Sequence, residues 1–249
     1  MACGEQCISL FIHEGKPSGT FSTLNGVRVY VATPPNPTPH KAILISPDIY
    51  GVDLKNTQLL ADRFAKDVNV PTYLIDTLGG NTVAEPGKQP ENFSLLEWIQ
   101  SNPPTGMMPY IEKVIEHLKG NNISHFAVAG YCYGGKHVLL MSQLNWVQVA
   151  AAFHPSLLEI PGDIEKLLST GKVPLLINSC ETDAQFPINS QKITDGILGD
   201  GKYKPGYKRT YYHGATHGFG CRADLNNELE KKAFDESYKE TVEWFKKYL

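Results

Sequence analysis

The stretch HFAVAGYCYGG, residues 125–135, decides the fold of this chain. It begins as an unbroken apolar run typical of a buried strand, and the sequence that follows, GGKHVLLMSQL, has the pattern of a helix. Between the two, Cys132 has Gly130 two residues before it and Gly134 two residues after it. This is the G-x-nucleophile-x-G pattern of a sharp strand-to-helix turn, with cysteine where serine is usual.

Such a turn suits a nucleophile for physical reasons. Small neighbours let the strand and the helix approach closely, while the central residue adopts strained backbone geometry. The helix N-terminus favours a thiolate and supplies N–H groups for a developing oxyanion. A buried, inert cysteine in a glycine-rich turn is the alternative interpretation. The flanking strand and helix, with a further glycine at Gly135, favour the nucleophile.

Short apolar runs alternate with helical patterns on both sides of this turn. Six buried strands are expected, at residues 41–46, 70–76, 125–130, 147–153, 173–179 and 208–213. Helices are expected at residues 57–68, 111–119, from 134 onward and over the amphipathic C-terminus, 227–249. This alternation predicts an α/β fold with a mostly parallel central sheet covered by helices on both faces. Functional residues should then gather at the carboxyl ends of the strands.

Length and charge limit the classes of protein that fit. The 249 residues are expected to form a single domain, 1–249, in which residues 1–24 are a less certain N-terminal extension. A net charge of −3 and the lack of a basic stripe argue against a nucleic-acid partner. No apolar run approaches the roughly 18 residues of a membrane span, and the N-terminus lacks a secretory signal pattern. We expect a cytoplasmic monomer or homodimer without a membrane partner.

The five cysteines indicate free thiols in a reducing compartment, because their number is odd and they are scattered along the chain. Cys3 and Cys7 resemble half of a metal site, but no second ligand pair lies nearby in the sequence. An unpaired, mobile terminus is the alternative for these two residues. We therefore expect no metal and no cofactor.

An acid and a histidine should follow the nucleophile along the chain in this type of fold. Asp183 comes just after the expected strand 173–179, and Glu181 is its local competitor. The shorter side chain, set farther into the loop, favours Asp183 as the residue that orients the histidine. His217 lies in the glycine-flanked loop HGATHGFG, whereas its rival His213 ends the strand before that loop. The loop position favours His217 as the base.

The elbow GYCYGG, the ETD segment and the HGFG loop together resemble the dienelactone hydrolase family, from about residue 25 to the C-terminus. The resemblance implies an α/β-hydrolase fold with a catalytic triad of Cys132, Asp183 and His217. The implied substrate is a small-molecule ester or lactone, hydrolysed through a thioester acyl-enzyme as in carboxymethylenebutenolidase. It also assigns the acid and the histidine more firmly than spacing does.

A fourth match lies in PDIYG, residues 47–51. In the family an acid at this position contacts the resting thiol until substrate binds. The resemblance thus implies a thiol-gating role for Asp48, although bacterial members typically carry the longer glutamate. A turn-forming, helix-capping residue is the alternative for Asp48. The geometry of the fold would place oxyanion N–H donors at Ile49 and Tyr133.

Substrate recognition departs from the family pattern. Bacterial members bind an anionic substrate with two arginines; this chain offers Arg222, and residues 91–110 contain no second one. Tyr50, Trp98 and Arg222 are the candidate substrate-binding residues. Large apolar side chains occupy the arginine-free stretch and either line an apolar cleft or pack a surface helix and loop: Phe93, Trp98, Met107, Met108 and Tyr110.

Other functions remain compatible with these residues. A different acyl-transfer or carbon–carbon hydrolase reaction could use the same triad, because fold and triad do not fix the substrate. A non-catalytic small-molecule-binding module could retain the fold. A redox sensor based on Cys132 is a further alternative, although no resolving cysteine is near it in sequence.

Overall fold

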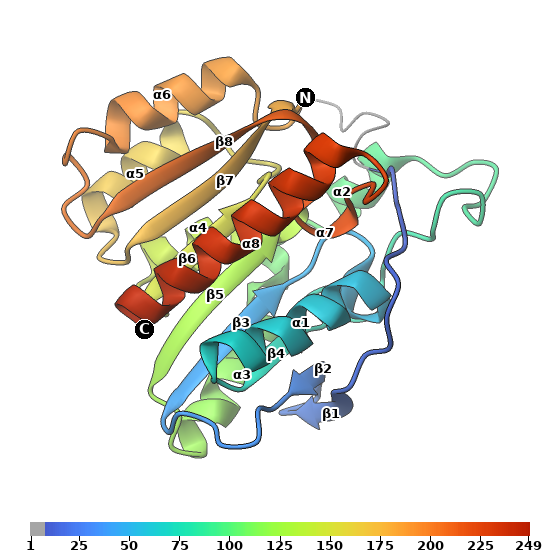
Figure 1. Ribbon diagram of the computed structural model, residues 1–249, viewed down its shortest axis with the longest axis vertical. Coiled ribbons are helices and arrows are strands. Elements are labelled where there is room, and N and C mark those ends of the chain that lie inside the picture. Colours follow the sequence, from blue (N-terminus) through green and yellow to red (C-terminus); the bar gives the residue numbers. More distant parts are fainter. Residues whose placement is uncertain (1–7) are drawn as a thin grey trace.

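The computed structural model describes residues 8–249, in which one eight-stranded sheet runs through the molecule (Figure 1). The strands lie in the order β1-β2-β4-β3-β5-β6-β7-β8. Their bounds are β1 Thr20–Leu24, β2 Val27–Ala32, β3 Lys41–Ser46, β4 Thr72–Ile75, β5 His125–Tyr131, β6 Val149–Phe153, β7 Leu175–Thr182 and β8 Tyr207–Thr216. Among the strand pairs of residues 8–249, β1–β2 and β2–β4 are antiparallel and the others are parallel. The expected mostly parallel sheet is confirmed.

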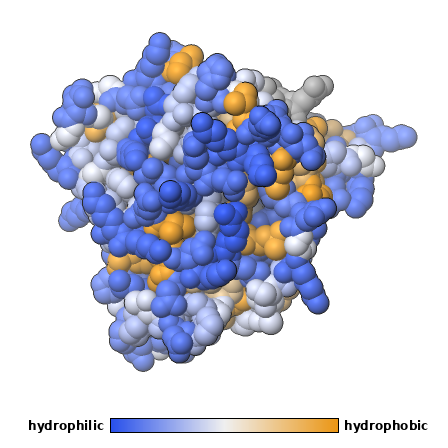
Figure 2. All heavy atoms as spheres, in the orientation of Figure 1, coloured by the Kyte–Doolittle hydropathy of each residue, from blue (hydrophilic) through white to orange (hydrophobic). Residues whose placement is uncertain are grey.

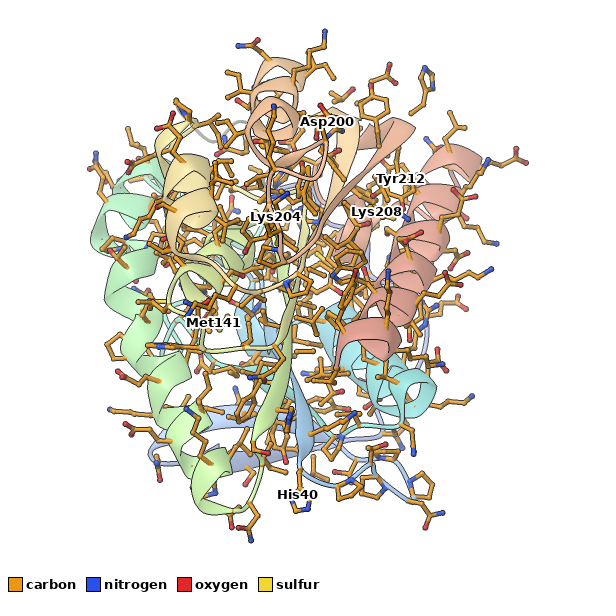
Figure 3. All side chains as sticks on the ribbon, turned by 90° about the vertical axis from the view of Figure 1, so that its left-hand side faces the viewer. His40, Met141, Asp200, Lys204, Lys208 and Tyr212 are labelled. Carbon is orange, nitrogen blue, oxygen red and sulfur yellow. The ribbon has the colours of Figure 1, made fainter. Side chains whose placement is uncertain are left out.

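Helices cover both faces of this sheet. They are α1 Lys55–Val68, α2 Leu95–Ser101, α3 Pro104–Gly120, α4 Tyr133–Gln143, α5 Gly162–Thr170, α6 Ile188–Leu198, α7 Phe219–Arg222 and α8 Glu228–Tyr248, with a short 3-10 turn η2 at Gly51–Asp53. From the side, α3, α5 and the α4 residue Met141 lie on one side of the strands, and α1 and α8 lie on the other (Figure 3). The expected layered α/β architecture is confirmed.

The central strands contribute side chains to two cores, one under each helical layer. In β3, Ala42 and Leu44 belong to the core beneath α3, α4 and α5, whereas Ile43 and Ile45 belong to the core beneath α1 and α8. Successive side chains of a strand point to opposite faces, so both sets are buried. This explains why the central residues of β3 and β5 form continuous apolar runs in the sequence.

The described N-terminal residues are part of the sheet and of its surroundings. Strand β1 pairs with β2 along its whole length. Four of its five residues are exposed, so it has no apolar run that would mark it as a strand. The two cysteines considered as half of a metal site, Cys3 and Cys7, lie outside the described residues.

The face covered by α1 and α8 is mainly hydrophilic, with hydrophobic side chains in small separate patches (Figure 2). Within residues 8–249, no helix has the length and apolar character needed to cross a membrane. The short helices α2 and α7 lie at the same end of the sheet (Figure 1). The site described below is at this end.

Candidate active site

Cys132 joins the end of β5 to the start of α4 in a strained turn. Its backbone angles are φ 50° and ψ −111°, outside the regions that residues with a side chain usually adopt. Such strain costs about 1–3 kcal/mol and persists only where the surroundings impose it. Here the Cys132 N–H donates to the Phe153 carbonyl at 3.1 Å, and its carbonyl accepts from the N–H groups of Gly135 and Ser156 at 2.9 and 3.0 Å. The turn is therefore held from both sides.

Two glycines of the elbow permit a close approach of three segments. A Cβ at Gly130 would clash with the carbonyl oxygen of Gly134, and a Cβ at Gly134 would clash with the carbonyl oxygen of Ser46. The end of β5, the first turn of α4 and the turn after β3 thus touch through their backbones. This contact brings the segment that carries Asp48 and Ile49 to the thiol.

Asp183 and His217 form a buried pair on the loops after β7 and β8. His217 Nδ1 lies 2.9 Å from Asp183 Oδ1, and each side chain is only 1% exposed. The same carboxylate oxygen accepts the backbone N–H groups of Gln185 and Phe186 at 2.8 and 3.0 Å. These donors fix the carboxylate, which in turn favours the imidazole tautomer protonated at Nδ1.

The Ser156 hydroxyl lies within contact distance of both the thiol and the imidazole. Its Oγ is 3.3 Å from Cys132 Sγ and 3.4 Å from His217 Nε2. Thiol, hydroxyl, imidazole and carboxylate therefore form one continuous polar chain inside the protein. Cys132 itself is 1% exposed.

Opposing effects set the protonation of this chain. Burial favours the neutral thiol, but the His217 charge, its hydrogen bond and the more distant Arg222 lower the pKa of Cys132 below its ordinary value. Burial favours the neutral imidazole, but the Asp183 carboxylate and the Cys132 thiolate raise the pKa of His217. Because each ion stabilises the other, the arrangement favours a thiolate–imidazolium pair.

A second imidazole packs edge-on against His217. The rings of His154 and His217 are 4.8 Å apart at 70°, and His154 is fully buried. Neither ring nitrogen of His154 has a hydrogen-bond partner among residues 8–249. Burial and the charges of His217 and Arg222 lower the pKa of His154 well below its ordinary value. It therefore stays neutral and does not compete with His217 for a proton.

The two rival residues pair with each other away from this chain of contacts. Glu181 Oε1 lies 3.4 Å from His213 Nε2, and the His213 side chain is 79% exposed. Glu181 also accepts the Gly214 N–H at 2.8 Å. The structure thus brings together Cys132, Asp183 and His217, and leaves both rivals at the surface.

Asp48 forms a second buried pair, with Arg222 of α7. Arg222 Nε lies 2.8 Å from Asp48 Oδ2, and both side chains are fully buried. The other carboxylate oxygen accepts the Tyr50 N–H at 3.0 Å, which is the turn-forming bond considered as the alternative for this residue. Cys221 Sγ is 3.5 Å from Oδ2. Within the described residues, Asp48 makes no hydrogen bond to Cys132.

The two residues expected to supply oxyanion N–H groups come from different segments of the site. Ile49 follows Asp48 on the turn after β3, and Tyr133 is the first residue of α4. Both are buried in the apolar cluster that includes Cys132. The first N–H groups of a helix lack intrahelical acceptors, so the Tyr133 N–H is available for an oxyanion.

The large apolar side chains of residues 91–110 separate into two groups. Phe93, Trp98 and Met107 pack in the cluster of Cys132, as does Tyr50. Met108 and Tyr110 instead belong to the core beneath α3. These side chains therefore pack in two separate clusters, and their use as the lining of a substrate cleft stays a prediction.

The candidate substrate residues are held by other parts of the chain. Trp98 donates from Nε1 to the Asn81 carbonyl at 3.2 Å and packs edge-on against Tyr133. The Tyr50 hydroxyl donates to the Ile8 carbonyl at 2.6 Å. Arg222 donates to the Ser9 carbonyl in addition to its pairing with Asp48.

Several of these partners were not expected from the sequence. Ile8 and Ser9 act through backbone carbonyls, for which the sequence carries no signal. His154 and Ser156 stand directly after β6, in FHPS, at the carboxyl end of a parallel strand. The rule that sites gather at strand ends could have found them.

A family model described as the dienelactone hydrolase family matches residues 27–249. This chain belongs to that family. Relatives cover nearly the same length: hydrolase pyvD of Aspergillus violaceofuscus is 29% identical over 98% of this chain and 96% of its own. Hydrolase tropI of Talaromyces stipitatus is 29% identical over 98% and 95%. The carboxymethylenebutenolidase homolog of Homo sapiens is 25% identical over 84% and 83%.

Solved structures agree on the fold. A dienelactone hydrolase from Anabaena variabilis superposes with a TM-score of 0.61 at 13% identity, over 95% of this chain and 100% of its own. A dienelactone hydrolase-like promiscuous phosphotriesterase from metagenomic libraries gives 0.67 at 17% identity, over 92% and 98%. The expected α/β-hydrolase fold is confirmed, and the protein is a hydrolase by its family.

Proposed function

We propose that this hydrolase cleaves a carboxylic ester or lactone of a small molecule, with Cys132 as nucleophile, His217 as base and Asp183 as the residue that orients the base. The observation that carries the proposal is the buried polar chain from the Cys132 thiol to the Asp183 carboxylate at a strained strand-to-helix turn. Strained cysteines next to an imidazole are suited to covalent catalysis.

The reaction begins with attack of the Cys132 thiolate on the substrate carbonyl. The carbonyl oxygen becomes an oxyanion that accepts the N–H groups of Ile49 and Tyr133. As the tetrahedral intermediate collapses, the C–O bond to the alcohol breaks and His217 donates its Nε2 proton to the leaving alkoxide. The product of this half-reaction is a thioester on Cys132.

Water completes the cycle. Neutral His217 takes a proton from a water molecule, whose oxygen attacks the thioester carbonyl. The C–S bond breaks, the carboxylic acid leaves, and the thiolate and imidazolium of the resting protein are restored. Asp183 holds the Nδ1 proton throughout and stabilises the imidazolium.

Asp48 acts in this scheme through position and charge. Its carboxylate is neutralised by Arg222 and bonds the Tyr50 N–H, so it fixes the turn that carries the Ile49 donor. Direct gating of the thiol by Asp48, which the family resemblance implies, would require the carboxylate to leave Arg222. We therefore propose that Asp48 is a positioning residue of the resting protein.

Hydrolysis of 4-nitrophenyl esters and of simple lactones tests the proposal. Wild-type protein should release nitrophenolate and open lactones, whereas Cys132→Ala should lose at least a thousandfold in kcat/KM because no nucleophile remains. Cys132→Ser keeps the shape of the turn and serves as the matched variant. Equal rates for wild type and Cys132→Ala would refute the assignment of the nucleophile.

A further inference from the structure

A cavity of about 360 Å³ lies beside the proposed triad. Its walls come from four segments: the end of α2 with the following prolines, the first turns of α4, and the loops after β6 and β7. Ile99, Leu157 and Leu158 supply apolar surface, and Lys136 and Gln185 supply polar groups. A space of this size holds a substituted aromatic or short branched acyl group.

Several residues that line the cavity are neighbours of the residues that contact the triad. Leu157 follows Ser156, whose hydroxyl is 3.3 Å from the Cys132 thiol. Gln185 donates its backbone N–H to Asp183 at 2.8 Å. Leu157 and Ile99 also pack against the apolar cluster that contains Cys132. The cavity is therefore lined by direct neighbours of the residues that contact the thiol and the Asp183 carboxylate.

The charges around the cavity disfavour an anionic ligand. Lys136 is the one cation among its lining residues, and its Nζ is paired with Asp163 Oδ2 at 2.6 Å in a nearly buried contact. Glu159 adds a carboxylate at the exposed rim. Arg222, the arginine considered as a ligand of an anionic substrate, is paired with Asp48. A ligand carboxylate would lose its hydration here without gaining an unpaired cation.

Gln185, on the cavity wall, carries an amide donor without a partner. The residue is 8% exposed, and its Nε2 has no hydrogen-bond partner anywhere in the described chain. A buried donor without an acceptor costs free energy that a ligand acceptor can recover. The terminal torsion of a glutamine side chain is broad, so the amide can turn toward a ligand oxygen.

We infer that this cavity binds the acyl part of an uncharged ester or lactone. The apolar body of that group packs on Ile99, Leu157 and Leu158, and an oxygen acceptor on it accepts a hydrogen bond from Gln185 Nε2. This inference rests on the proposed function for the reaction, and it adds the substrate class: neutral, apolar and oxygen-bearing.

Three methyl 3-arylpropanoates test the inference, with acetyl, isopropyl or carboxylate at the para position of the ring. The methyl alcohol part is small, so the aryl acyl part must fill the cavity. Titration calorimetry on Cys132→Ala protein measures binding without turnover. The acetyl compound should bind about fivefold more tightly than the isopropyl compound, since it adds one neutral hydrogen bond, and the carboxylate should bind weakest.

Gln185→Met in the same background should remove the acetyl advantage while leaving the isopropyl affinity within twofold. Gln100→Met is the matched control, because Gln100 is exposed on α2 next to the cavity wall. It should preserve the whole order of affinities. Tightest binding of the carboxylate, equal binding of all three compounds, or an acetyl advantage retained in Gln185→Met would each overturn the inference.

Turnover of the same compounds separates this inference from the proposed reaction. If Cys132→Ala protein binds them in the expected order but wild-type protein hydrolyses none, the cavity assignment stands and the reaction is wrong. If wild-type protein hydrolyses them with no preference for the acetyl compound over the carboxylate, the reaction stands and the cavity assignment is wrong.

Discussion

Two buried acid–cation pairs lie at the same end of the sheet, and they differ in what their cation can do. Asp183–His217 and Asp48–Arg222 have contact distances of 2.9 and 2.8 Å, and both are shielded from solvent. Histidine gains or loses its proton near neutral pH, whereas arginine stays charged. The far side of His217 faces Ser156 and the thiol, whereas Arg222 also contacts a backbone carbonyl.

This difference distinguishes a buried ion pair that takes part in a reaction from one that stabilises the fold. The pair with a titratable member is connected to a nucleophile, so its proton can move during a reaction. The pair with a permanent charge stabilises the turn after β3. Its Arg222 charge favours the nearby thiolate, whereas its Asp48 charge opposes it. The first pair should therefore control activity, and the second should chiefly control stability.

The largest effect should come from Asp183→Asn, which should lower kcat/KM for an aryl ester about a thousandfold or more. The amide cannot hold the Nδ1–H tautomer or stabilise the imidazolium. Steady-state kinetics measures this loss. Glu181→Gln is the matched control two residues away, and it should leave kcat/KM within twofold. A similar loss of kcat/KM in both variants would contradict the assignment of Asp183, and not Glu181, as the acid that orients His217.

Arg222→Met should lower the free energy of unfolding by about 3–5 kcal/mol, because it leaves Asp48 as an uncompensated buried charge. Urea unfolding followed by circular dichroism measures this change. The double variant Asp48→Asn/Arg222→Met should recover part of the loss. A decrease below about 1 kcal/mol in Arg222→Met would mean that the second pair does not stabilise the fold.

The pH dependence of thiol alkylation should show the ion pair at the elbow. The pKa of Cys132 is lowered, so its reaction with iodoacetamide should reach its plateau at a lower pH than an ordinary thiol, whose pKa is about 8.5. His217→Gln removes the main positive charge and should shift the midpoint upward. Cys132→Ala gives the background from other cysteines. An unshifted midpoint in His217→Gln would contradict the pairing.

Ser156→Ala should have the smallest effect, a loss of about fivefold in kcat/KM. The variant removes a neutral hydroxyl that contacts the thiol and the imidazole but leaves both reacting groups in place. Ser124→Ala, at an exposed position, controls for loss of a serine hydroxyl elsewhere. A loss as large as that of Asp183→Asn would make Ser156 a reacting group.

The centre of the fold could be predicted from the sequence because its strands are buried on both faces. The central residues of β3 and β5 and all of β6 are apolar, and these strands were expected within a few residues of their observed bounds. The strands β1 and β2 were both missed; β1 lies at an edge of the sheet and is mostly exposed. The short helices α2, α5, α6 and α7 were also not expected, since they follow loops and carry few apolar repeats.

The residues of the site also differ in how far local sequence could predict them. Cys132 and His217 stand in glycine-rich loops with recognisable spacing, so local sequence identified them as candidates. The partner of Arg222 depends on which distant segments the fold brings together, and no local pattern distinguishes a substrate ligand from the partner of Asp48. The roles assigned to Cys132, Asp183 and His217 are proposals that the predictions above test.

The most direct test is to find which residue carries the acyl group during turnover. Wild-type protein is mixed with 4-nitrophenyl acetate, quenched in acid within the first turnover, and mapped by peptide mass spectrometry. We predict one acetyl group on the peptide that contains Cys132, released by neutral hydroxylamine as expected for a thioester. An acetyl group on Ser156, which is also within reach of His217 Nε2, would contradict the assignment of Cys132 as the nucleophile.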